Sequence, residues 1–142
     1  MRFWDASAIV ALCVQQPASE RATAYLREDG DVWVWWGTQI ECLSAFCRLA
    51  REGALASAAL AEARGRLDML RNAWSEILPR EAVRERAARA LRIHGLKAAD
   101  ALQLASSLVW SDGRPNGRIF VTGDQRLGDA ADLEGFAVVW TS

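Results

Sequence analysis

The stretch Arg118-Ile119-Phe120-Val121-Thr122-Gly123-Asp124 joins an apolar, partly β-branched run to an acid that follows after one glycine. Such a run is typical of a short buried strand, and the glycine after it indicates a turn. The chain begins in the same way, because Arg2-Phe3-Trp4 leads directly into Asp5. Both segments therefore predict a strand with an aspartate at its carboxyl end.

Similar short apolar segments alternate with helical patterns along the whole chain. This alternation favours an α/β sandwich, in which a mostly parallel central sheet of about four or five strands is flanked by helices. No linker or repeat interrupts it, so residues 1–142 are expected to form one domain. The expected strands cover residues 2–4, 32–36, 74–78, 118–121 and 136–140, and the expected helices cover residues 7–16, 19–27, 38–51, 57–71, 81–92, 97–110 and 124–131.

The composition of the 142 residues is that of an ordinary globular protein, with 51% hydrophobic and 25% charged residues. No apolar run reaches the roughly 20 residues of a membrane helix, and the first residues do not fit a signal peptide, so a cytoplasmic location is expected.

Cys13, Cys42 and Cys47 show no CxxC spacing, which favours free thiols. The net charge of −1 means that any RNA contact needs a local basic patch and metal ions.

The single histidine, His94, limits the chemistry that is open to this chain. A Ser-His-Asp triad would have to use it, and no GxSxG motif is present. Zinc sites with several histidines are excluded. Because Gly95 follows at an expected helix end, the sequence favours a capping role for His94.

Two further acids, Glu41 and Asp100, lie near the starts of expected helices. Thr38-Gln39-Ile40-Glu41 fits a capping box, in which Glu41 reaches back to the helix start. The same position would also present a carboxylate toward the sheet edge, and spacing leaves both interpretations open. Asp100 lies in an otherwise apolar segment, which predicts that it points partly inward. A buried charge needs a cationic partner, and Lys97, an arginine or a metal ion could each serve.

The four acids Asp5, Glu41, Asp100 and Asp124 form the candidate site. Aspartates after strands are also common as helix caps, although two of them at one sheet edge favour a functional interpretation. Binding sites in open α/β sheets lie beyond the carboxyl ends of the strands. Oxygen ligands without His or Cys suit Mg²⁺ or Mn²⁺ rather than zinc. Such ions polarise a phosphate and orient a water for in-line attack, and this chemistry needs no histidine base.

The sequence resembles the PIN-domain nucleases over nearly its whole length, in the order of their motifs. It is most similar to the VapC group, the toxins of bacterial type II toxin–antitoxin pairs. The segments that carry the resemblance are FWDASAIV at residues 3–10, Thr38–Glu41 with Ser44-Ala45 and Arg48, ADALQLA at residues 99–105, and FVTGDQRL at residues 120–127 with Ala130-Ala131 and Gly135.

This resemblance implies an Mg²⁺-dependent endoribonuclease, in which Mn²⁺ can substitute. It implies that Mg²⁺ is held directly or through water by Asp5, Glu41, Asp100 and Asp124. Ser7 and Thr122 match positions that support the acids by hydrogen bonds. The resemblance also implies cleavage of RNA by water, a homodimer, and inhibition by a small antitoxin protein.

Other classes of protein fit the sequence less well. A haloacid-dehalogenase-like phosphotransferase would need a second aspartate two residues after Asp5, where Ser7 stands. A receiver domain would need paired acids near the first strand and a lysine late in the chain. Position 6 is instead an alanine, and the only lysine, Lys97, follows no strand. A metal-free, PIN-like binding module stays open, and failure to bind Mg²⁺ would favour it.

Aromatic and basic clusters elsewhere are assigned structural roles. Trp33 and Trp35 alternate along an expected strand, which favours packing in the core or at a dimer surface over base stacking. The arginines near residues 80–92 are mixed with glutamates, which favours a solvated helix face over contact with RNA.

Overall fold

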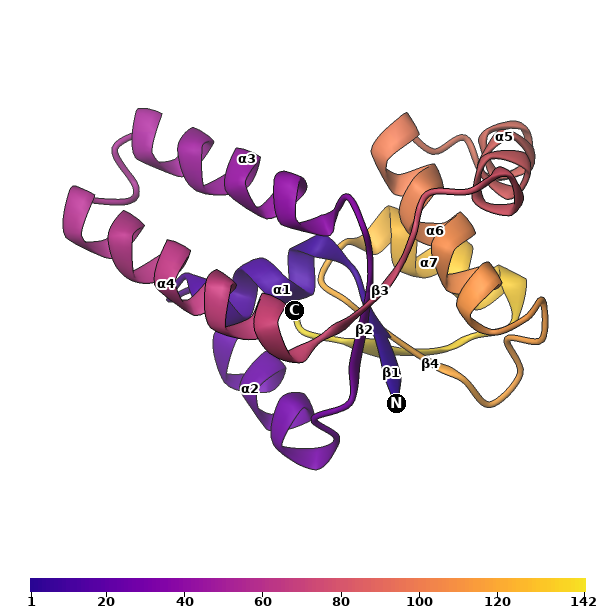
Figure 1. The fold of residues 1–142 in the computed structure, drawn as a ribbon, viewed down its shortest axis with the longest axis horizontal. Helices are drawn as coiled ribbons and strands as arrows, with labels where there is room; N and C mark the ends of the chain where they lie inside the picture. The colour runs from indigo at the N-terminus through magenta and orange to yellow at the C-terminus, as the bar shows by residue number, and fades with distance from the viewer.

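The computed structural model describes residues 1–142, and it shows a parallel sheet between two layers of helices (Figure 1). All strands pair in parallel, in the order β3-β2-β1-β4-β5. The predicted α/β sandwich with a parallel central sheet is confirmed. The strands are β1 (Arg2–Trp4), β2 (Val32–Trp35), β3 (Ser75–Ile77), β4 (Ile119–Thr122) and β5 (Ala137–Trp140).

Seven helices connect these strands, and each predicted element is present with its ends shifted by no more than three residues. In Figure 1, α1 to α4 lie on one side of the sheet and α5 to α7 on the other. None of the helices has both the length and the apolar character needed to cross a membrane. The helices are α1 (Ala6–Cys13), α2 (Ser19–Glu28), α3 (Thr38–Arg51), α4 (Ser57–Ala73), α5 (Glu81–His94), α6 (Ala98–Trp110) and α7 (Gln125–Glu134).

The sheet has a hydrophobic core on each face, because successive side chains of a strand point in opposite directions. Phe3 packs with α5, α6 and α7, whereas its neighbour Trp4 packs with the other helical layer. Trp35 is 7% exposed and belongs to the first core, and Trp33 packs against the same core. Of the two roles predicted for these tryptophans, core packing or a dimer surface, the structure shows core packing.

The strand order creates a crevice between β1 and β4. From β1 the chain first adds β2 and β3 on one side, and it later returns to add β4 and β5 on the other side. Such a switch in strand order opens a crevice at the carboxyl ends of the two central strands. Asp5 directly follows β1, and Asp124 follows β4 after Gly123. The topology thus brings both aspartates to one edge of the sheet.

Two local interpretations of the sequence are wrong. No capping box exists at α3, because this helix begins after Gly37 without any side-chain cap. His94 does not cap α5 either, since Gly95 ends that helix with a φ of 61°, a conformation that glycine adopts without steric cost. His94 Nε2 instead lies 2.8 Å from Glu134 Oε1, and this contact links α5 to α7. The three cysteines are free, as expected.

A close approach between α7 and β5 leads to a stability prediction. A Cβ added at Gly128 would overlap the indole ring of Trp140, whereas one added at Gly65 in α4 would meet no atom within 4 Å. We expect Gly128→Ala to lower the free energy of unfolding by about 1–3 kcal/mol, because the core must shift to make room. Gly65→Ala, its matched control, is expected to raise it by about 0.5–1 kcal/mol, because alanine is the better helix former. Urea unfolding curves would measure both, and a stable Gly128→Ala variant would contradict the close packing.

Candidate active site

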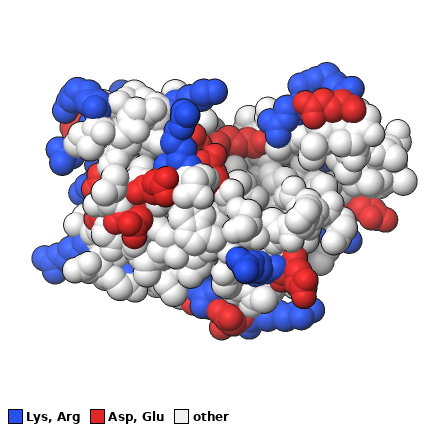
Figure 2. All heavy atoms as spheres, turned by 180° about the vertical axis from the view of Figure 1, so that it is seen from behind, with Lys and Arg blue, Asp and Glu red and all other residues white.

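A cavity of about 310 Å³ opens at the crevice between β1 and β4, and all four candidate acids line it. Each comes from a different part of the fold: Asp5 follows β1, Glu41 lies in the first turn of α3, Asp100 in the first turn of α6, and Asp124 immediately before α7. Figure 2 shows acidic atoms in the hollow between the two helical layers, with basic atoms on either side of it. The structure therefore gathers acids that are far apart in the sequence.

Asp5 is held most firmly of the four. It is 1% exposed, and its Oδ1 accepts hydrogen bonds from Ser7 Oγ at 2.7 Å and from the Ala8 amide at 2.9 Å. Its Oδ2 accepts a short hydrogen bond from Thr122 Oγ1. Ser7 and Thr122 thus contact Asp5 in the way that the resemblance implies for these two positions. The bond from Ala8 also makes Asp5 the cap of α1.

Asp124 combines a capping role with a place in the cavity. Its Oδ1 accepts a hydrogen bond from the Leu127 amide at 2.9 Å and so caps α7. Its own amide donates to Thr122 Oγ1 at 2.9 Å, so Thr122 connects the two aspartates. Helix capping occupies one carboxylate oxygen, which leaves Asp124 Oδ2 free for a ligand. The capping and functional interpretations are therefore compatible.

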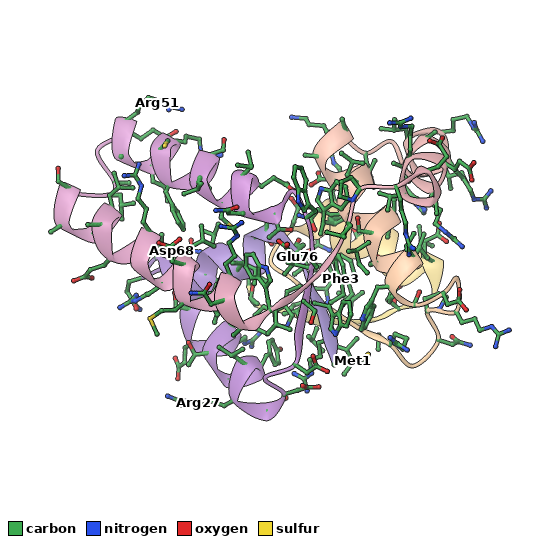
Figure 3. The ribbon with its side chains drawn as sticks, in the orientation of Figure 1. Met1, Phe3, Arg27, Arg51, Asp68 and Glu76 are labelled. Carbon is green, nitrogen blue, oxygen red and sulfur yellow. The ribbon has the colours of Figure 1, made fainter.

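Glu41 points away from the start of its own helix and toward α6. Its Oε2 accepts a hydrogen bond from Gln103 Nε2 at 2.8 Å. In Figure 3, Arg51 marks the end of α3 that is farthest from the sheet, so the first turn with Glu41 is the end next to the crevice. Of the two interpretations that spacing left open, the geometry favours a carboxylate presented to the sheet edge.

Asp100 is half-buried, and its carboxylate takes part in no hydrogen bond or ion pair. All ion pairs of the chain lie outside the cavity. Burial and the charge of Asp124 raise the pKa of Asp100, and these effects are larger than the opposing effects of the Lys97 and Arg126 charges. A half-buried carboxylate needs a cationic partner, and no side chain of this protein supplies one to Asp100 by direct contact.

Two residues of the cavity carry chemistry that the sequence did not single out. Gln103 lies on α6 one turn after Asp100, and its polar side chain in an otherwise apolar helix is the signal that could have found it. Arg48 is the one basic residue lining the cavity. Arg48 belongs to one of the motifs that carry the resemblance, but the sequence alone does not show that it faces the acids.

The cavity concentrates negative charge that burial makes unfavourable. Burial raises the pKa of Asp5 to about 6, with hydrogen bonds from Thr122, Ser7 and Ala8 acting in the opposite direction. Burial likewise raises the pKa of Glu41 to about 7, and the charges of Asp5 and Asp100 add to that increase. The pKa of Asp100 is raised by burial and by the charge of Asp124. A bound cation would relieve this repulsion.

The donor set fits Mg²⁺ or Mn²⁺ by its chemistry. It consists of carboxylate oxygens without histidine or thiolate, and Asp100 offers both of its oxygens unpaired. No three acidic, histidine or cysteine side chains are already close enough to form a metal cage. Mg²⁺ needs no such cage, because it keeps several waters and binds through one or two carboxylates together with substrate phosphates. The open arrangement suits this mode better than a closed structural site.

The raised pKa values predict how stability changes with pH. Because the folded protein binds protons more tightly than the unfolded chain at Glu41, unfolding becomes easier as pH rises from 4.5 to about 7. The raised pKa of Asp5 has the same effect on stability as pH rises from 3.8 to about 6. We expect the urea midpoint of the metal-free protein to fall as pH rises across this window. The fall should be less steep in Glu41→Gln. At pH values above the window, added Mg²⁺ should restore the midpoint of the wild type. A midpoint that rises with pH equally in both proteins would contradict this.

Comparisons with known proteins agree with this fold. The PIN domain family model matches residues 2–133. Among solved structures, the chain is similar to PAE2754 from Pyrobaculum aerophilum, with 20% identity and a TM-score of 0.65 over 91% of this chain and 78% of that one.

It is also similar to a toxin–antitoxin complex from Klebsiella pneumoniae, with 16% identity and a TM-score of 0.65 over 100% and 98% of the two chains. FitAcB from Neisseria gonorrhoeae shows 23% identity and a TM-score of 0.67 over 99% and 98%. No curated protein matches the sequence significantly. Because the family model covers nearly the whole chain, this protein belongs to the PIN-domain family.

Proposed function

We propose that this protein is a cytoplasmic, Mg²⁺-dependent endoribonuclease, in which Mn²⁺ can replace Mg²⁺, and that residues 1–142 act as one domain. The observation that carries the proposal is the meeting of four carboxylates, from four separate elements, in one cavity at the switch in strand order. Membership of the PIN-domain family supports a nuclease. The three free cysteines are in keeping with a reducing compartment.

In this proposal, Asp5, Glu41, Asp100 and Asp124 hold the divalent cation directly or through water. When bound, the cation would polarise the scissile phosphate and lower the pKa of the attacking water. Ser7 and Thr122 fix the orientation of Asp5 by the hydrogen bonds described above. A rigid carboxylate matters because small displacements of a ligand weaken the whole site.

Arg48 is proposed to contact the RNA backbone. Its side chain is exposed, lines the acidic cavity and forms no ion pair there. A guanidinium beside a metal site can bind a phosphate next to the cleaved bond with two hydrogen bonds. This contact reads the backbone and not the bases, so it favours RNA in general over one sequence.

We also propose that the protein is the toxin of a type II toxin–antitoxin pair and forms a homodimer. The similarity to a toxin–antitoxin complex from Klebsiella pneumoniae supports an antitoxin partner. Several large apolar side chains are more than half exposed and would suit partner surfaces, among them Trp36, Ile40, Met69 and Leu78. Light scattering of the purified protein, alone and with the product of a neighbouring small gene, would test both assemblies.

The experiment that tests the proposed activity is an incubation of purified protein with labelled RNA, in Mg²⁺, in Mn²⁺ and in chelator. We expect cleavage with either ion and none in chelator. Arg48→Ala is expected to cleave about 10-fold more slowly, mainly through a higher KM, because it removes a substrate contact and not a cation ligand. Arg51→Ala, from the same helix but outside the cavity, serves as the matched control. Metal-independent cleavage would contradict the proposal.

A further inference from the structure

Gln103 lines the acidic cavity from α6, although only 1% of its surface is exposed. Its Nε2 donates one hydrogen bond to Glu41 Oε2 at 2.8 Å and another to Thr38 Oγ1 at 3.0 Å. Both acceptors belong to the first turn of α3. A single buried amide therefore joins α6 to α3 at the wall of the candidate site.

The orientation of this amide is dictated by Glu41. A carboxylate can only accept hydrogen bonds, so the NH₂ end of Gln103 must face it. The other end, Oε1, is buried without any partner. A buried carbonyl without a partner is unfavourable, and an apolar side chain of the same length would avoid this cost. The charge-assisted hydrogen bond to Glu41 is what offsets it, so core packing does not account for Gln103.

The Glu41 carboxylate depends on this one contact for its orientation. Gln103 donates the only hydrogen bond that its carboxylate receives, whereas Asp5 receives three. Glutamate also has three rotatable side-chain bonds, so its carboxylate can turn in many directions when nothing holds it. Partners outside the ligand set are known to orient metal ligands and to raise metal affinity.

We propose that Gln103 is a positioning residue that holds the Glu41 carboxylate, through Nε2, in the orientation needed for the divalent-cation site, with Thr38 anchoring the amide. This inference rests on the proposed function, because it assigns a supporting partner to one of the four acids named there. Gln103 acts through Glu41 and needs no contact of its own with substrate.

The test compares Mn²⁺ affinity, measured by electron paramagnetic resonance, in the wild type and in Gln103→Met, which keeps the length of the side chain and removes both hydrogen bonds. We expect affinity about 10- to 100-fold weaker, the usual effect of losing an outer partner of a metal ligand. Ser106→Ala is the matched control. Ser106 is fully buried on the same helix and donates to Leu102 O at 2.7 Å, away from the cavity. Its loss is expected to leave Mn²⁺ affinity unchanged.

Two further variants separate positioning from a general loss of structure. Thr38 does not line the cavity, so Thr38→Val is expected to weaken Mn²⁺ binding only because the Gln103 amide loses one anchor. In a Glu41→Ala background, Gln103→Met is expected to change the affinity less than twofold, since the carboxylate that it positions is gone. Thermal melting of each variant would show that it is folded.

The outcomes distinguish this inference from the function on which it rests. If the wild type binds no Mn²⁺, the proposed metal-dependent function is wrong. If the wild type binds Mn²⁺ and folded Gln103→Met binds it equally well, the function stands and the positioning role is wrong. An equal loss in the presence and absence of Glu41 would also overturn it, because Gln103 would then act independently of that carboxylate.

Discussion

Replacing Asp100 by asparagine is expected to slow RNA cleavage strongly and, at the same time, to leave the metal-free protein at least as stable as the wild type. The carboxylate makes no hydrogen bond or ion pair within the chain, and burial together with the neighbouring charge of Asp124 makes its ionised form less favourable. Removing the charge therefore relieves repulsion without breaking a contact. Cleavage should fall by about 10²–10³-fold or more, as when a charge-stabilising group is removed from an active site.

Asp68→Asn is the matched control for this substitution. Asp68 is exposed on α4 and does not line the cavity, and it undergoes the same chemical change. Single-turnover cleavage rates and urea midpoints would be measured for both variants. We expect Asp68→Asn to match the wild type in rate. A fully active Asp100→Asn variant would remove this residue from the site, and a strongly destabilised one would show that its carboxylate supports the fold.

The largest loss of stability is expected from Phe3→Ala. Phe3 is fully buried in the central strand β1, and its ring lies 5.5 Å from that of Phe120 and 5.9 Å from that of Trp110. Truncation of a buried aromatic side chain leaves a cavity and costs about 3–5 kcal/mol. That is a large part of the roughly 5–15 kcal/mol by which a native domain is stable.

Urea unfolding of Phe3→Ala would be compared with that of Leu133→Ala. Leu133 is 78% exposed, so its truncation removes an apolar side chain without creating a cavity and is expected to change stability by less than about 0.5 kcal/mol. Similar losses in the two variants would mean that β1 is not at the centre of the core.

The order of strands and helices could be predicted because it rests on local patterns. Short apolar, partly β-branched runs such as Ile119–Thr122 favour buried strands, and Gly123 marks where this run ends. The aspartates after β1 and β4 could be assigned to one sheet edge for the same reason, since the carboxyl ends of parallel strands meet there. What could not be predicted is the strand order itself, which depends on how the layers pack.

The role of Glu41 shows why spacing alone was insufficient. Thr38 and Glu41 have the spacing of a capping box, yet the conformation of the chain entering α3 at Gly37 leaves the helix without a side-chain cap. The deciding contact comes from Gln103, 62 residues later in the sequence. A partner so distant leaves no periodic signal near Glu41, and only the packing of α6 beside the sheet brings it into reach.

The central claim is that Asp5, Glu41, Asp100 and Asp124 together bind a divalent cation. The measurement that tests it most directly is a Mn²⁺ titration near neutral pH, followed by electron paramagnetic resonance, of the wild type and of four variants in which one acid at a time is replaced by its amide. We predict saturable binding in the wild type and a marked loss of affinity in every variant. Binding that none of the four substitutions weakens, or no binding by the folded wild type, would contradict the account.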